Sequence, residues 1–301
     1  MNEDAPHPVL EPLEVWLGLI ANPAVPGEAL RDLAARQDAH PEALAALAED
    51  EARLKQTPEI AAAIYANPRA PLSVANRAVA TCHRVGVVPE GICGFEALAT
   101  AIAADPAALD PSVADSGFGE MLDGAPEASP DEPGPAGAAQ EAPGEPGPAG
   151  STTTSSSGNK KAEGRRSATI DFSRLKLYEK IRLATLGNAY CRQNLLRDSN
   201  RMVAMAAIRS PQITDGEIAK AAGNRALSED VIRYISNRKE MVKQYAVRLA
   251  LVGNAKCPLA VTLRLLPSLS AEDIKQIARS KNVPGALAVA AKRLAAAKGP
   301  Q

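Results

Sequence analysis

The sequence predicts an all-α protein made of two α-solenoid modules, and three observations lead to this prediction. Apolar residues recur at helical spacing from Phe172 to Leu294, and Asn- or Ser-centred turns interrupt that pattern every 17 to 28 residues. The break Asn-Pro-x-x-Pro occurs twice in the first half, at Asn22 and Asn67. A unit this short cannot bury its own apolar face, so neighbours along the chain must cover it.

The first half is expected to hold a disordered lead over residues 1–11 and an acidic helical-repeat module over residues 12–104. The module begins with an amphipathic helix around Leu13 to Ile20 that stops at the first break. Prolines near the first helical position indicate where further helices start. Those helices are expected at Gly27 to Arg36, Pro41 to Glu49 and Pro58 to Tyr65.

Each break has a physical rationale that requires no ligand. The first proline cannot donate to the helix ladder and disfavours helical geometry at the residue before it, so the incoming helix ends. Asn tolerates left-handed geometry and can bond nearby backbone groups, while the second proline starts the next helix. We therefore interpret Asn22 and Asn67 as structural residues.

The segment from Ile20 to Ala34, a helix, an Asn-Pro-x-x-Pro turn and a second helix, resembles the leucine-rich repeat variant and HEAT-like class of bacterial helical repeats. Residues 180–284 are further similar to uncharacterised repeat proteins of myxobacteria-like bacteria. The resemblance covers about 210 residues in two pieces and implies a fold rather than an activity. Some repeat-variant proteins carry an iron–sulfur cluster on clustered cysteines. No cofactor is carried over here, because the cysteines are scattered at Cys82, Cys93, Cys191 and Cys257.

Residues 105–168 are expected to form a disordered linker. Seven prolines lie between Gly119 and Gly150, and a Ser/Thr run and a basic run follow them. The basic run, Lys160 to Arg166, either binds nucleic acid or a membrane or is a solvated linker end. One apolar island, Phe118, Met121 and Leu122, is either a short docking motif or the frayed end of the first module.

A basic helical-repeat module is expected over residues 169–298. Hydroxyl caps followed by acids predict helix starts at Thr214, Ser228 and Ser270. The expected helices are Ser173–Leu186, Arg192–Asp198, Arg201–Arg209, Asp215–Ala222, Ser228–Ser236, Lys239–Val252, Leu259–Leu266, Ala271–Ser280 and Gly285–Ala297.

The two halves carry opposite charge. Residues 1–159 hold 7 Lys and Arg against 24 Asp and Glu, while residues 160–301 hold 27 against 11, so their net charges are −17 and +16. If equivalent helices share a face, cations of the second module gather into a stripe that suits an acidic protein surface or a phosphate backbone. The alternative is an evenly solvated basic surface. The candidate partner-binding residues are Arg192, Arg197, Arg201, Arg209, Arg238, Lys239 and Lys243.

Catalysis is not expected, and neither is a metal, a cofactor or a small-molecule substrate. His7, His40 and His83 are far apart, and no phosphate-binding glycine motif occurs. No apolar run is long enough to span a membrane, so a cytoplasmic location is expected. Two hypotheses follow: a scaffold that docks an acidic partner protein, or a nucleic-acid-binding module. In either, the acidic half could inhibit the basic one.

Overall fold

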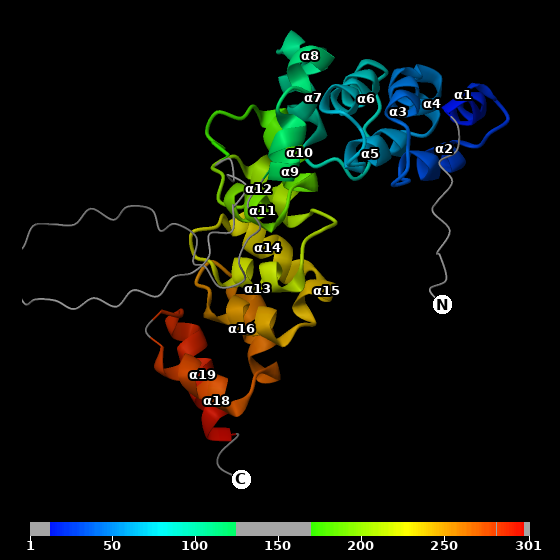
Figure 1. The fold of residues 1–301 in the computed structure, drawn as a ribbon. Coiled ribbons are helices and arrows are strands. Elements are labelled where there is room, and N and C mark those ends of the chain that lie inside the picture. Colours follow the sequence, from blue (N-terminus) through cyan, green and yellow to red (C-terminus); the bar gives the residue numbers. More distant parts are fainter. Residues whose placement is uncertain (1–12, 125–169, 281, 298–301) are drawn as a thin grey trace, which may run out of the picture.

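The structure is a computed structural model that describes residues 13–124, 170–280 and 282–297 (Figure 1). All regular elements within these ranges are helices, and none is a strand. The all-α expectation is confirmed for this part of the chain. None of the helices in these ranges has both the length and the apolar character that crossing a membrane requires.

The helices follow one another along an elongated, bent body with two arms (Figure 1). The first arm consists of α1 (Leu13–Ala21), α2 (Gly27–Ala34), α3 (Pro41–Glu49), α4 (Glu51–Gln56), α5 (Glu59–Ala66), α6 (Leu72–Arg84), α7 (Phe95–Ala103), η1 (Pro106–Leu109), α8 (Pro111–Ala114) and α9 (Phe118–Gly124). The second consists of α10 (Leu177–Leu186), α11 (Ala189–Leu195), α12 (Arg201–Ile208), α13 (Asp215–Gly223), α14 (Glu229–Asn237), α15 (Lys239–Val242), α16 (Tyr245–Gly253), α17 (Leu259–Leu265), η2 (Leu266–Ser268), α18 (Ala271–Arg279) and α19 (Gly285–Ala297).

Helices close in chain order make most of the contacts, for example α3 with α6 and α13 with α16. The arms meet where α10 packs against α5, α6, α7 and α9. Their buried apolar residues form one cluster that extends from Trp16 to Ala291, so the arms share a core.

At two of the breaks, an asparagine side chain bonds the end of an earlier helix, about 30 residues back in the chain. Asn67 is buried, and its Nδ2 donates to the carbonyl oxygens of Ala34 at 2.7 Å and Arg36 at 2.9 Å. Asn254, also buried, makes the same pair of bonds to residues 32 and 30 positions earlier. Both asparagines have extended backbone, with φ of −82° and −96°, so neither adopts the left-handed geometry that asparagine tolerates. What the side chain supplies is two N–H donors, one for a buried carbonyl and one for a partly buried carbonyl.

Arginines provide a second device at the two Asn-Pro-x-x-Pro breaks. Arg53 of α4 donates to the carbonyl oxygens of Asn22 at 2.6 Å and Val25 at 2.7 Å, the first and fourth residues of the first break. Arg182 of α10 makes the matching bonds to the second break, at 2.8 and 3.0 Å. The bonds that join α10 to the first arm thus match the bonds that join α4 to the first break.

The linker expected over residues 105–168 does not begin at 105. Residues 105–124 form η1, α8 and α9, and Asp105 and Asp110 cap the first two of these helices. Asp115 ties the segment to α6 by accepting from the backbone N–H and the hydroxyl of Ser73, at 2.8 and 2.7 Å. Packing against α6 lets short turns form where composition alone indicated a linker. The remainder of the expected linker lies outside the described residues.

Boundaries in the second arm differ from expectation by three residues or more at three helices. The helix expected from Ser173 begins at Leu177, as α10. Asn188 caps α11 by accepting from the N–H of Cys191, so this helix begins before Arg192. The single helix expected over Lys239–Val252 is two helices, α15 and α16, because Gln244 between them has extended backbone (φ −76°, ψ 136°).

The expected hydroxyl caps form at two of three positions. Thr214 and Ser270 accept backbone N–H groups at the starts of α13 and α18. Ser228 precedes α14 without a capping bond, and its hydroxyl is buried without a partner.

Candidate anion-binding cleft

A cleft of about 400 Å³ lies where the end of α14 meets α15, α16 and α17. This volume is within the range of roughly 300–1,000 Å³ that is typical of ligand sites. Four of the lining residues are cationic and none is acidic. The cleft is lined by Ser236, Asn237, Lys239, Val242, Lys243, Arg248, Arg264, Leu265 and Ser268.

Two breaks in the helices shape the cleft. Arg238 has extended backbone and both ends α14 and begins α15, and Gln244 separates α15 from α16 in the same way. The helix between them is a single turn, so Lys239 and Lys243, four residues apart, lie on one side of it.

Lys239 and Lys243 belong to the candidate surface that the sequence predicts, whereas two other cations of the cleft do not. Arg248 and Arg264 come from α16 and α17, which contact each other. No spacing within the sequence connects these arginines to the lysines, because tertiary packing alone brings them together.

The charges of the cleft have no carboxylate partner within the described residues. Lys239, Lys243 and Arg264 are exposed. Arg248 is half-buried, with its guanidinium 5.6 Å from the centre of the Tyr245 ring and its Nε buried without a hydrogen-bond partner. Because neighbouring like charges repel, the cleft favours a ligand that brings negative charge.

The neutral side chains of the cleft add few donors. The hydroxyl of Ser236 donates to the carbonyl of Arg233 at 2.8 Å, and that of Ser268 donates to the carbonyl of Leu265 at 2.7 Å. Their hydrogens are committed to the backbone, so the donors left to a ligand are the four cations and the amide of Asn237.

Of the other candidate partner-binding residues, Arg209 and Arg238 come together at Tyr234. Their guanidinium carbons lie 5.0 and 5.1 Å from its ring centre. Arg201 is exposed and forms an ion pair of 2.9 Å with Asp230. Arg197 is exposed on the same arm.

Arg192 is not part of an exposed surface. Its side chain is 5% exposed and donates to both carboxylate oxygens of Glu217, at 2.9 and 3.0 Å, and to the carbonyl of Gly187 at 2.6 Å. Burial raises the pKa of Glu217, but hydrogen bonds from Arg192 and Thr214 outweigh it and hold the pKa below its usual value. The expectation that Arg192 faces a partner is therefore wrong: this arginine holds α11 against α13.

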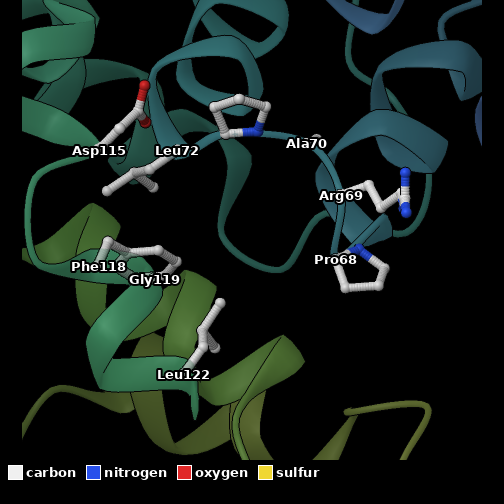
Figure 2. Close-up of a pocket in the computed structure, with 9 residues that line it drawn as sticks. Pro68, Arg69, Ala70, Leu72, Asp115, Phe118, Gly119 and Leu122 are labelled. Atoms are coloured by element: carbon white, nitrogen blue, oxygen red, sulfur yellow. The ribbon is translucent and has the colours of Figure 1, made fainter. Parts of the chain in front are cut away.

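The apolar island expected as a docking motif packs onto its own arm. Phe118 is buried, and Met121 and Leu122 are half-buried against the core. Figure 2 shows Phe118 and Leu122 of α9 facing the break around Pro68 across a small hollow, whose volume is about 200 Å³. The island thus has the position of a packed end of the first arm, which was the alternative interpretation.

In the part of the chain that the structure describes, histidines and cysteines do not gather into a site. His40 packs against Trp16 with ring centres 6.1 Å apart, and His7 lies outside the described residues. Burial raises the pKa of the thiols of Cys82, Cys191 and Cys257 to about 11, so they are protonated at neutral pH. Within the described ranges no three His, Cys, Asp or Glu side chains are placed to hold a metal ion.

Comparison with protein-family models, with curated proteins and with solved structures gives no match to this chain.

Proposed function

We propose that this chain is a non-enzymatic interaction scaffold whose basic cleft docks an acidic segment of a partner protein. The observation that carries the proposal is the set of four cations, Lys239, Lys243, Arg248 and Arg264, in one cleft without a carboxylate. Three of these side chains are exposed, so a partner can reach them without rearrangement of the fold. The four free cysteines support a reducing, cytoplasmic setting.

The proposal includes an α-solenoid architecture of the HEAT-like or leucine-rich-repeat-variant kind. Contacts between helices close in chain order support it. Recurrence of one device supports it further, because Arg53 and Arg182 bond the same two positions of successive breaks. In this architecture the cleft is one part of a long surface that a partner segment can follow.

A second candidate function is binding to the phosphate backbone of nucleic acid. The stack of Arg209 and Arg238 on Tyr234 favours it, because Arg238 adjoins Lys239 and lengthens the basic surface beyond the cleft. One tyrosine gives little area for stacking bases, so any such binding would rest on phosphate contacts.

Fluorescence anisotropy with a labelled oligoglutamate peptide tests the proposed function. The double variant Lys239→Gln/Lys243→Gln is expected to weaken binding by about tenfold or more at low salt, since each lost contact of this kind contributes roughly 1 kcal/mol. Raising the salt concentration is expected to weaken wild-type binding steeply.

A matched control removes the same charge elsewhere. Lys275→Gln/Lys292→Gln changes two exposed lysines on α18 and α19, outside the cleft, and is expected to bind like wild type. Equal weakening of peptide binding by both double variants would show a general charge effect and would overturn the proposal that the peptide binds in the cleft. Tight binding of a duplex oligonucleotide, with no binding of oligoglutamate, would favour the second candidate.

A further inference from the structure

We propose that the cleft recognises a phosphorylated side chain of the partner, and this inference rests on the proposed docking function. In this proposal Arg248 and Arg264 hold the phosphate group, and Lys239 and Lys243 lie around it. The acidic segment that the scaffold selects is therefore a phosphorylated one.

Charge balance favours phosphate over carboxylate. The lining residues bring four positive charges to a cleft of about 400 Å³ and no negative one. A carboxylate supplies a single charge, whereas a phosphomonoester supplies about −1.5 to −2 at neutral pH, with three acceptor oxygens. The remaining neutral donor, the Asn237 amide, also requires an acceptor.

Arg248 is held in place before any ligand binds. Its guanidinium lies over the ring of Tyr245, whose hydroxyl donates to Asp273 and accepts from the backbone N–H of Ser270 at 3.0 Å. The Tyr245 hydrogen bond, followed by that of Ser270, keeps the pKa of Asp273 below its usual value, so this carboxylate stays charged and the tyrosine stays fixed.

The two guanidinium groups of the cleft give the second reason for a phosphate at this position. The Nε of Arg248 is buried and out of a ligand's reach, so the donors that this arginine offers are its two terminal nitrogens. Guanidinium groups bind phosphate through two parallel N–H bonds, a geometry that lysine cannot reproduce. Arg264, on the neighbouring helix, supplies a second guanidinium to the same cleft.

The surroundings favour a phosphorylated protein over a nucleic acid. Val242 and Leu265 line the cleft beside the cations and can contact the carbon chain that carries the phosphate. No aromatic residue lines the cleft, so a base would find nothing to stack on.

The experiment compares three labelled synthetic peptides that share an acidic background and differ at one central residue: serine, glutamate or phosphoserine. Wild-type protein is expected to bind the phosphoserine peptide about tenfold more tightly than the glutamate peptide, as bidentate charge-assisted bonds require. Inorganic phosphate is expected to compete. Arg264→Lys keeps the charge and is expected to abolish the preference, while glutamate-peptide binding stays within about threefold.

Arg293→Lys, an exposed arginine of α19 outside the cleft, is the matched control and is expected to keep the full preference. Thermal melts of both variants confirm that they fold. Equal affinity for phosphoserine and glutamate peptides would overturn the phosphate assignment and leave acidic docking in place, whereas failure to bind any peptide would overturn both. Displacement of the phosphopeptide by a duplex oligonucleotide, unaffected by Arg264→Lys, would overturn the choice of a protein ligand.

Discussion

Arg182 is a buried cation whose partners in the described part of the chain are backbone carbonyls rather than a carboxylate. It has no exposed surface, lies 5.1 Å from the ring centre of Tyr65, and its burial lowers its pKa to about 10. At neutral pH it is still charged, so its hydrogen bonds to the second break must offset the cost of removing it from water.

Arg182→Lys is expected to lower the free energy of unfolding by about 2 kcal/mol, because the ammonium of the shorter lysine side chain lies about one bond short of Nη2, the nitrogen that donates to both carbonyls, and leaves them without their donor. Urea denaturation followed by circular dichroism measures it.

Tyr65→Phe is the companion variant, because the Tyr65 hydroxyl is buried without a partner. Removing that hydroxyl is expected to be neutral or stabilising by up to about 1 kcal/mol. A large loss of stability in Tyr65→Phe would show that the hydroxyl has a partner, and unchanged stability in Arg182→Lys would deny the arginine its role at the junction.

Asn254→Ala is expected to destabilise the protein by about 2 kcal/mol, since one buried and one partly buried carbonyl lose their donor. Asn224→Ala is a suitable control: its side chain accepts one bond, from the backbone of Ala226 at 2.8 Å, and it is half-buried. That change is expected to cost less than about 1 kcal/mol. Equal losses of stability by the two variants in thermal melts would show that the Asn254 amide contributes no more to stability than the half-buried Asn224 side chain does.

At the scale of helices, capping and tertiary pairing combine at the start of α13. The hydroxyl of Thr214 accepts from the backbone of Glu217 at 3.4 Å, while a carboxylate oxygen of Glu217 accepts from the backbone and the hydroxyl of Thr214, at 2.8 and 2.9 Å. The same carboxylate binds Arg192 of α11. One glutamate thereby starts a helix and fixes its neighbour.

Glu217→Gln is expected to cost about 3 kcal/mol at pH 7, because Arg192 is left buried without its counter-charge. The pKa of Glu217 is lower in the folded state than in the unfolded state. Its contribution to stability is therefore complete above the unfolded-state pKa and is lost as pH falls through the folded-state pKa. The stability difference between wild type and variant should narrow in urea melts from pH 5 towards pH 3, and a constant difference would contradict the ion pair's role.

The helices that sequence reasoning located well have start signals within a few residues. Pro41 begins α3, and Thr214 caps α13. The sequence carries no local signal where the deciding contact is distant, as when Ser73 on α6 anchors Asp115 in a segment whose composition is typical of a linker. For the same reason, the sequence predicts only two of the four cations of the cleft. Lys239 and Lys243 share a turn, whereas Arg248 joins them only after folding.

At the scale of the whole molecule, the arms form one body because α10 packs on the first arm as a further helix would. Charge asymmetry was readable from the sequence, since it is a sum over residues. The junction was not, because Arg182 lies 115 residues from Asn67 in the chain.

Hydrogen exchange is expected to be slowest in α5, α6 and α10 and to quicken towards α1 and α19, because the end helices have neighbours on one side only. Mass spectrometry of peptides from each arm measures this gradient. Arg182→Lys should speed exchange in α10 more than in α19. Uniform protection from exchange along the chain would contradict a shared core. So would the lowest protection at the junction of α10 with the first arm.

The order of helices along the body also determines how the molecule would respond to tension (Figure 1). Pulled from its two ends, it need not fail all at once, because each outer helix can peel away while the next still holds. An extension trace would then rise as a staircase. The highest force is expected at the step where the carbonyls of the second break release the guanidinium of Arg182.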